Sequence, residues 1–231
     1  MKKKLIGAIV LIAALAFAGC GNKNEKKNQA EKAEEKMEKP SQMLIIVDPQ
    51  IDFTTGSLAT AKGPEVMDRL AESINKGVLR KYDCVVVTQD SHPANHCSFI
   101  EQGGTFPPHC VQGTNGMEVY PKLQKALNEA ADVEIIYLQK GDLPEKEEFS
   151  IFQNEQNGKK LHGIIEQAKF DGIDICGIAT DYCVYETTRD LMEFFPAKKI
   201  RIITNCIAAV DESDTKLADL MAKTGVSSIT Y

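Results

Sequence analysis

Short apolar runs alternate with amphipathic stretches along most of this chain, and this alternation constrains the fold more than any other feature. Strands that are apolar on both faces and alternate with helices are typical of a parallel sheet covered by helices. The pattern therefore predicts an α/β fold of three layers, with helices on both faces of a central, mostly parallel six-stranded sheet. The runs of strand length are Met43–Val47, Cys84–Thr88, Glu134–Leu138, Ile173–Ile178, Ile200–Thr204 and Val226–Thr230. The stretches with helical spacing are Glu65–Arg80, Tyr120–Ala131, Lys159–Lys169, Tyr182–Phe195 and Glu212–Lys223.

Residues 1–19 have the pattern of an export signal. Lys2–Lys4 form a positive start, and Leu5–Phe17 is an apolar segment too short to span a bilayer as a mature helix. The segment ends in Ala18-Gly19-Cys20, which resembles the lipobox of bacterial lipoproteins, where the cysteine is lipidated and becomes the new N-terminus. An ordinary secretory signal is the alternative, but the thiol favours the lipoprotein. We therefore expect an exported protein, held at a membrane of the cell envelope by a lipid on Cys20.

A highly charged segment follows this signal. Gly21–Pro40 is almost all Lys, Glu, Asn and Gln, without one aromatic or β-branched residue. Such a segment buries too little apolar surface to offset the entropy of ordering, so residues 20–42 are expected to form a disordered tether. A transient charged helix over Glu31–Glu38 would serve equally well as a tether. The remaining residues, 43–231, suffice for one domain with a sizeable core.

The charge balance of the chain is acidic. The formal net charge is −6, and removal of residues 1–19 with their three lysines would take it to −9. Nucleic acids select basic surfaces, so we expect no nucleic-acid partner. The pattern does not fix the oligomeric state, and a homo-oligomer is compatible with it.

Cys183 lies at a turn between a strand and a helix. Ile173–Ile178 is followed by Ala179-Thr180-Asp181, and the helical spacing begins at Tyr182. A thiol in the first turn of a helix lies in the positive field of the N-terminus, which predicts a lowered pKa and a nucleophile. Either Thr180 or Asp181 is expected to cap this helix. The alternative is a small apolar core residue, as for most free cysteines, so the neighbours of Cys183 must decide.

Two charged residues follow other apolar runs. Asp48 comes immediately after Met43–Val47, and Lys140 lies just beyond Glu134–Leu138. Because the carboxyl ends of parallel strands meet at one edge of the sheet, both side chains are expected near Cys183. Taken separately, Asp48 fits a turn cap and Lys140 fits a solvated charge. A carboxylate, an ammonium and a thiol at one edge together predict a thiol hydrolase.

A cluster of histidines occupies the long connection after the second strand. Three of the four histidines of the chain fall between residues 92 and 109. Asp90, His92 and His96 form a D-x-H-x3-H pattern, and His109 follows. One carboxylate with two or three imidazoles suits Zn²⁺, Fe²⁺ or Mn²⁺, with zinc the first choice. The cysteines at positions 97 and 110 adjoin these residues and are alternative ligands.

Five ordered blocks of sequence resemble the isochorismatase-like cysteine hydrolases, and within them the nicotinamidases. The blocks are VDPQIDFTTGSL (47–58), TQDSHPANHCSF (88–99), FPPHCVQGTNG (106–116), QKG (139–141) and GIATDYCVYETTRDL (177–191). The resemblance runs over nearly all of residues 44–231. It implies a catalytic triad, which falls here on Asp48, Lys140 and Cys183. It also implies a metal site, which falls here on Asp90, His92 and His109, and His96 is a further ligand in some members.

The resemblance also implies how the substrate is held. It places an oxyanion hole at the backbone N–H groups of Ala179 and Cys183, next to a cis peptide between Ile178 and Ala179. The rings of Phe53 and Phe106 would enclose the ring of the substrate. This chain departs from most nicotinamidases by having Ser91 and Phe106 at positions where tryptophan is usual.

The family implies a metal-dependent amidohydrolase that converts nicotinamide to nicotinic acid and ammonia through a thioester. One alternative is an isochorismatase-like hydrolase of another small amide or of an enol ether. The set Asp90, His92 and His109 argues against that alternative, because metal-free relatives lack it. A lipid-anchored protein that binds a ligand or metal without catalysis is the alternative from another class. The complete triad argues against such a loss of catalysis.

Overall fold

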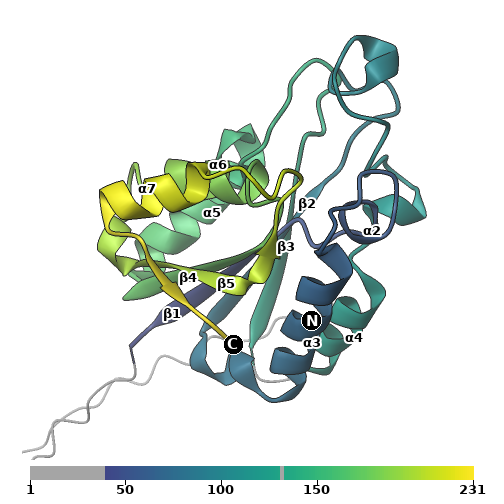
Figure 1. The fold of residues 1–231 in the computed structure, drawn as a ribbon. Helices are drawn as coiled ribbons and strands as arrows, with labels where there is room; N and C mark the ends of the chain where they lie inside the picture. The colour runs from purple at the N-terminus through teal and green to yellow at the C-terminus, as the bar shows by residue number, and fades with distance from the viewer. Residues whose placement is uncertain (1–39, 131–132) are drawn as a thin grey trace, which may run out of the picture. The chain divides into compact units, whose positions relative to one another are not determined.

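All six predicted strands form one sheet, and every neighbouring pair in it is parallel. The computed structural model describes residues 40–130 and 133–231 (Figure 1). The order across the sheet is β3-β2-β1-β4-β5-β6, which confirms the predicted parallel α/β architecture. The strands are β1 (Gln42–Val47), β2 (Cys84–Asp90), β3 (Glu134–Lys140), β4 (Gly172–Ile178), β5 (Ile200–Ala208) and β6 (Ser227–Ile229).

Apart from α2, which no predicted stretch covers, the helices of the described residues lie close to the predicted stretches, with two instructive differences. They are α2 (Ile51–Thr54), α3 (Gly63–Asn75), α4 (Pro121–Glu129), α5 (Glu155–Ala168), α6 (Cys183–Leu191) and α7 (Lys216–Thr224). The helix predicted over Glu65–Arg80 ends at Asn75, because Gly77 turns the backbone at a φ of 87° before a short 3-10 helix. By contrast, α5 begins four residues before the predicted start at Lys159, with a polar first turn. The side chain of Asn154 caps this turn by accepting a hydrogen bond from the N–H of Asn157.

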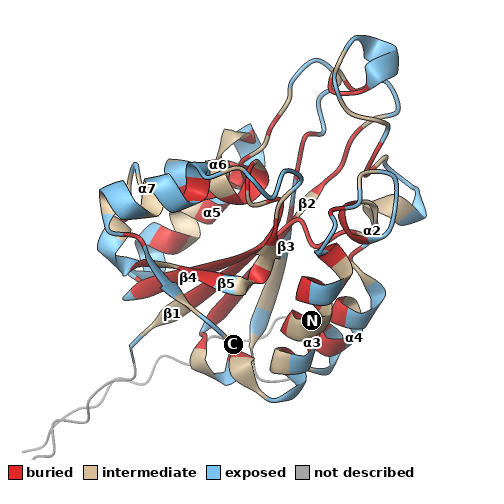
Figure 2. Cartoon of the chain, in the orientation of Figure 1, coloured by how far each residue is buried: buried red, intermediate tan, exposed pale blue. Residues whose placement is uncertain are grey.

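The helices form two layers, one on each face of the sheet (Figures 1 and 2). Alternate residues of β1 divide between them: Leu44 and Ile46 join the core under α3 and α4, whereas Met43 and Ile45 join the core under α5, α6 and α7. These four side chains are fully buried. Side chains alternate between the two faces of a strand, so a strand buried on both faces reads as one continuous apolar run.

The outer strands are less buried than the central ones. Along β3, Glu134, Tyr137 and Gln139 are exposed, and the predicted last strand shortens to Ser227–Ile229. A strand at the edge of a sheet has a neighbour on one side only, so more of its surface stays open.

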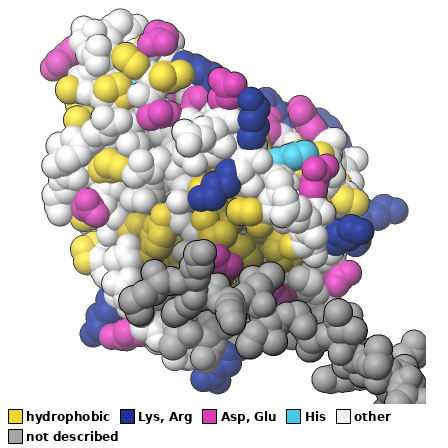
Figure 3. Space-filling model, turned by 180° about the vertical axis from the view of Figure 1, so that it is seen from behind, with side chains coloured by type: hydrophobic (Ala, Val, Ile, Leu, Met, Phe, Trp, Pro, Cys, Tyr) yellow, Lys and Arg dark blue, Asp and Glu magenta, His cyan; other side chains and the backbone are white. Residues whose placement is uncertain are grey.

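On the face seen in Figure 3, basic and acidic side chains are mixed, and apolar side chains gather in its lower half.

The predictions for the N-terminal part meet the structure only at residues 40–42. The export signal, the lipidation of Cys20 and nearly all of the tether fall outside the described residues. The folded domain begins slightly before the predicted Met43, because β1 already begins at Gln42 and the N–H of Ser41 donates to Asp171 at 2.9 Å. Across the described residues, no helix combines the length and the apolar character needed to cross a bilayer.

Candidate active site

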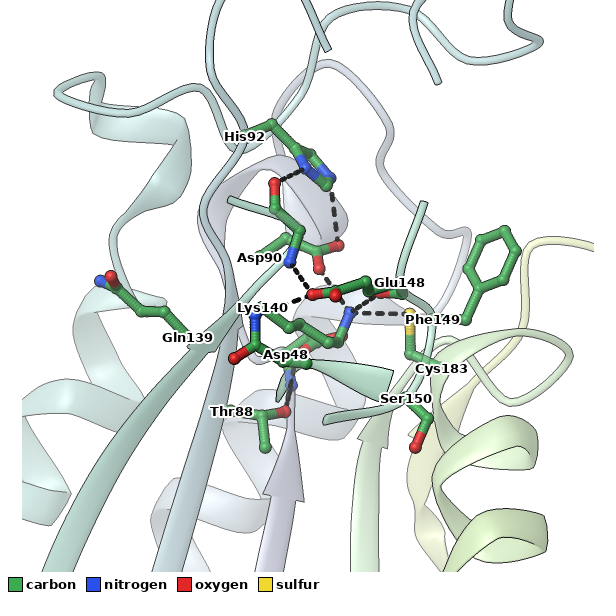
Figure 4. A network of polar contacts seen from close by, with 12 residues as sticks. Asp48, Thr88, Asp90, His92, Gln139, Lys140, Glu148, Phe149, Ser150 and Cys183 are labelled. Carbon is green, nitrogen blue, oxygen red and sulfur yellow. Dashed lines mark hydrogen bonds and ion pairs between the residues drawn. The ribbon is translucent and has the colours of Figure 1, made fainter. Parts of the chain in front are cut away.

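Asp48, Lys140 and Cys183 meet at the carboxyl edge of the sheet (Figure 4). Asp48 follows β1, Lys140 ends β3, and Cys183 begins α6 after the turn that leaves β4. Nζ of Lys140 lies 3.0 Å from Oδ2 of Asp48 and 3.6 Å from Sγ of Cys183. All three residues are buried, so the convergence predicted from the strand order is confirmed.

Thr88, a residue that the sequence analysis did not single out, holds Asp48 in place. Its hydroxyl donates to Oδ1 of Asp48 at 2.6 Å and accepts from the backbone N–H of Asp48 at 3.2 Å. Asp48 has a φ of 44°, in the left-handed region that non-glycine residues rarely adopt. A hydroxyl at the end of the apolar run Cys84–Thr88 was the available signal, because buried polar groups need partners.

Lys140 is shared by two carboxylates rather than one. Its ammonium also contacts Oδ1 of Asp90, which the sequence analysis had placed only at the metal site. Burial acts to lower the pKa of Lys140, but the negative charges of Asp48 and Asp90 raise it well above its usual range. Burial raises the pKa of Asp48, whereas Lys140 and His92 overcome burial at Asp90 and lower its pKa.

The predicted lowering of the Cys183 pKa is wrong. Burial raises the pKa of this thiol well above its usual value, and the charge of Lys140 opposes the increase without cancelling it. The carboxylates of Asp48 and Asp90 add to the increase. Loss of hydration and nearby negative charge both disfavour a thiolate, and here they outweigh the field of the helix N-terminus.

The predicted cap of α6 by Thr180 or Asp181 is also wrong. Tyr182 occupies the cap position, and no side chain caps the helix. The carboxylate of Asp181 instead accepts hydrogen bonds from the backbone N–H groups of Val210 and Asp211, at 3.0 and 2.8 Å. Asp181 therefore ties the loop after β5 to the turn that carries Cys183.

The turn before Cys183 has the predicted backbone geometry. The peptide bond between Ile178 and Ala179 is cis. Gly177 has a φ of 123°, and a Cβ there would lie 2.0 Å from the carbonyl oxygen of Val47, so the turn requires glycine. Within the described part of the chain, the backbone N–H groups of Ala179 and Cys183 have no hydrogen-bond acceptor. Both groups are therefore available to a bound oxyanion.

Asp90, His92 and His109 present donor atoms that lie within 4.8 Å of one another. Nδ1 of His92 is 2.8 Å from the carbonyl of Gly141, and Nδ1 of His109 is 2.8 Å from the carbonyl of Pro107. Since a carbonyl only accepts, each Nδ1 carries the proton and each Nε2 keeps a lone pair. Among the described residues, the buried Nε2 of His92 has no hydrogen-bond partner, and it lies 3.6 Å from Oδ2 of Asp90. Both atoms are therefore free to bind a divalent metal together.

His96 lies beside these three residues, and both of its ring nitrogens already contact other groups. The ring stacks on His92 with centroids 3.9 Å apart. Nε2 lies 3.0 Å from the carbonyl of Lys146, and Nδ1 lies 2.7 Å from the hydroxyl of Ser98. Neither of the cysteines at positions 97 and 110 belongs to a candidate ligand group among residues 40–130 and 133–231.

A cavity opens beside Cys183, Asp90 and His109, and aromatic rings form much of its wall. The predicted Phe53 and Phe106 both line it. The ring of Phe106 stands edge-on to Tyr182 and Phe149, with centroids 5.7 and 6.5 Å away. Phe149, Tyr182, Leu58 and Val210 also line the cavity and were not predicted, because a helical or loop position does not reveal which side chains turn toward a site.

A thiol beside a carboxylate, an ammonium and two free backbone N–H groups is the geometry of a cysteine hydrolase on an α/β sheet. Comparison with known families makes the class specific. The Isochorismatase domain family matches residues 42–230, and the chain belongs to this family.

Several family members of known activity are similar to the chain. The nicotinamidase/pyrazinamidase of Mycobacterium tuberculosis is 34% identical over 186 residues, which cover 77% of this chain and 91% of that protein. The nicotinamidase of Escherichia coli is 30% identical over 185 residues, covering 72% and 82%. The crystal structure of the pyrazinamidase of Pyrococcus horikoshii in complex with zinc superposes with a TM-score of 0.69 at 30% identity, over 83% of this chain and all of that one.

Proposed function

We propose that the protein hydrolyses nicotinamide to nicotinic acid and ammonia through a thioester on Cys183. The observation that carries the proposal is the contact of Lys140 with both Asp48 and Cys183, beside a cavity lined by aromatic rings. A flat heteroaromatic amide suits such a cavity, because aromatic rings pack favourably edge to face or offset. The nicotinamidases among the relatives support this choice of substrate.

In the proposed mechanism, Asp48 takes the proton of Cys183 as the thiolate attacks the amide carbon. The raised pKa of Asp48 suits a group that must accept this proton and later release it. Lys140 stabilises the thiolate, and the N–H groups of Ala179 and Cys183 bind the oxyanion. Asp48 then protonates the departing ammonia. Water, deprotonated by Asp48, hydrolyses the thioester and restores the thiol.

Asp90, His92 and His109 would hold a divalent metal, zinc in the first place and iron or manganese otherwise. Such an ion supplies a Lewis acid for the ring nitrogen of the substrate, directly or through a water, and so orients the amide. The zinc bound by the pyrazinamidase of Pyrococcus horikoshii supports this assignment. His96 remains a candidate fourth ligand, which would require its bond to Ser98 or Lys146 to break.

Removal of the metal should lower kcat/KM for nicotinamide by at least about tenfold, since the substrate loses its orientation. Protein treated with a chelator and then desalted is assayed for ammonia before and after zinc is added back. Recovery on zinc addition is the expected result. Full turnover by protein shown to be free of metal would contradict the role of the metal.

Phe106→Ala should raise KM for nicotinamide by about tenfold and change kcat less, because the ring contacts the substrate equally before and during reaction. Steady-state ammonia release at several substrate concentrations measures both constants. Phe194→Ala is the matched control, since Phe194 packs against Phe152 away from the cavity. An unchanged KM in the Phe106 variant would remove this ring from the substrate site.

We also propose that the protein is exported and anchored through a lipid on Cys20, with residues after it acting as a tether. The positive start, the short apolar segment and Ala18-Gly19-Cys20 support this. Mass spectrometry of protein from membranes should find a diacylated N-terminal Cys20. Protein with an intact Met1 and no lipid would contradict the anchor.

A further inference from the structure

Glu148 is a buried carboxylate for which the proposed mechanism has no use. Its side chain is 1% exposed and lies on the segment that follows β3, close to Lys140 (Figure 4). Oε2 accepts hydrogen bonds from the backbone N–H of Gly141 at 2.8 Å and from Nδ2 of Asn154 at 2.9 Å. Oε1 lies 2.7 Å from Nζ of Lys146. A charged group is buried at a cost unless such partners hold it, so this position is built around the carboxylate.

Through Gly141, the carboxylate of Glu148 reaches the metal site. The N–H of Gly141 donates to Glu148, and its carbonyl accepts from Nδ1 of His92 at 2.8 Å. Gly141 has a φ of 67°, and a Cβ there would lie 2.4 Å from Cε1 of His92. The peptide therefore packs directly on the imidazole, so the orientation of His92 follows the orientation of Gly141.

Through its own backbone, Glu148 reaches the triad. Its carbonyl accepts a hydrogen bond from Nζ of Lys140 at 3.0 Å. This neutral acceptor joins the carboxylates of Asp48 and Asp90 around the ammonium. Because the side chain of Glu148 is fastened to Gly141 and Asn154, the position of this carbonyl is fixed as well.

We propose that Glu148 is a positioning residue that orients Lys140 of the triad and His92 of the metal site together. The inference rests on the proposed function for the role of Lys140, whereas the link to His92 stands on the metal-ligand geometry. Partners that fix the second ring nitrogen of a ligating histidine govern metal affinity, and their loss costs about 10–100-fold. A residue that only stabilised the loop would lower the melting temperature and leave both functions of the folded protein intact.

Two substitutions at Glu148 separate hydrogen bonding from charge. In Glu148→Gln, the amide oxygen replaces Oε2 and still accepts from Gly141 and Asn154, while the ion pair with Lys146 is lost. In Glu148→Ala, every one of these contacts is lost. Glu145→Ala, an exposed carboxylate of the same segment, is the matched control.

The first readout is the affinity of the purified protein for Zn²⁺ alone, measured by competition with a chelating dye. Glu148→Ala should bind Zn²⁺ at least about tenfold more weakly than the parent protein, and Glu148→Gln should stay within about threefold of it. The second readout is kcat for nicotinamide at saturating Zn²⁺, which should fall by at least about tenfold in Glu148→Ala and recover in Glu148→Gln.

Unchanged Zn²⁺ affinity in a folded Glu148→Ala protein would overturn the proposal. Equal losses of Zn²⁺ affinity in Glu148→Gln and Glu148→Ala would also overturn it, because the charge of Glu148 and not its hydrogen bonds would then determine the affinity. A parent protein that binds Zn²⁺ but releases no ammonia would refute the proposed function and leave the Zn²⁺ comparison valid.

Asn154→Asp provides a second variant should Glu148→Ala fail to fold. An aspartate keeps an oxygen for the N–H of Asn157 and so preserves the cap of α5. It also sets a carboxylate against Oε2 of Glu148 and Oδ1 of Asp142, both of which now accept from Nδ2. The repulsion should displace Glu148 and weaken Zn²⁺ binding by several-fold to about tenfold. Zn²⁺ affinity equal to that of the parent protein would contradict the proposal.

Discussion

Ammonia release from nicotinamide should fall by about 10⁴-fold or more when Cys183 is replaced by alanine, because no other group can form the thioester. Cys183 is the only thiol in contact with Lys140 among the described residues. The substitution removes only the sulfur, so the ion pair of Asp48 with Lys140 and the side chains of Asp90, His92 and His109 are retained. We therefore expect the variant to fold and to bind Zn²⁺ as the parent protein does.

The matched control for this variant is Cys84→Ala. Cys84 begins β2 and so lies at the opposite edge of the sheet from the triad. Loss of its sulfur removes a similar volume without touching Asp48, Lys140 or the aromatic cavity. Ammonia release at the rate of the parent protein is expected for Cys84→Ala. Substantial activity in the Cys183→Ala variant would show that the nucleophile is another group.

Lys140→Met should abolish activity and also destabilise the protein by about 3–5 kcal/mol. The methionine fills a similar volume but leaves Asp48 buried without a cation and removes the ammonium from Asp90. Uncompensated buried charge is among the most costly defects a substitution can create. Part of this cost is recovered if a carboxyl group takes up a proton, and a protonated Asp48 cannot act as the base.

Denaturant unfolding and ammonia release measure the two effects separately. Lys125→Met is the control, because the side chain of Lys125 is 76% exposed and its ion pair with Glu129 lies at the protein surface. Exposed ion pairs contribute little, so we expect a change below about 1 kcal/mol and unchanged turnover. A stable and active Lys140→Met protein would show that Lys140 neither belongs to the catalytic triad nor balances the charge of the buried carboxylates.

The sequence sufficed for the sheet and for the convergence of the triad because both follow from local patterns. Each catalytic candidate stands directly after an apolar run, and parallel strands bring such positions to one edge. The partners of the triad were harder to foresee. Thr88 and Glu148 act through contacts across 40 and 7 residues, and nothing in their immediate surroundings indicates the group they hold.

The state of Cys183 shows where local reasoning gave the wrong sign. The helix N-terminus is visible in the sequence, whereas the burial of Cys183 and its proximity to the negative charge of Asp90 appear only when the chain is folded. For the same reason, Asp181 looked like a cap for its own helix, although it binds the loop after β5. Sequence rules of short range predict hydrogen bonds within one turn of the chain. The pKa values and hydrogen bonds of a buried site depend on groups that come from distant strands.

The most direct test is product analysis of purified, zinc-loaded protein incubated with nicotinamide, with pyrazinamide and aliphatic amides in parallel. Nicotinic acid and ammonia should accumulate in equal amounts, and both should be absent with Cys183→Ala. The absence of both products from nicotinamide, with a folded protein that has bound zinc, would contradict the proposed activity. Hydrolysis of another amide alone would keep the cysteine mechanism and replace the substrate.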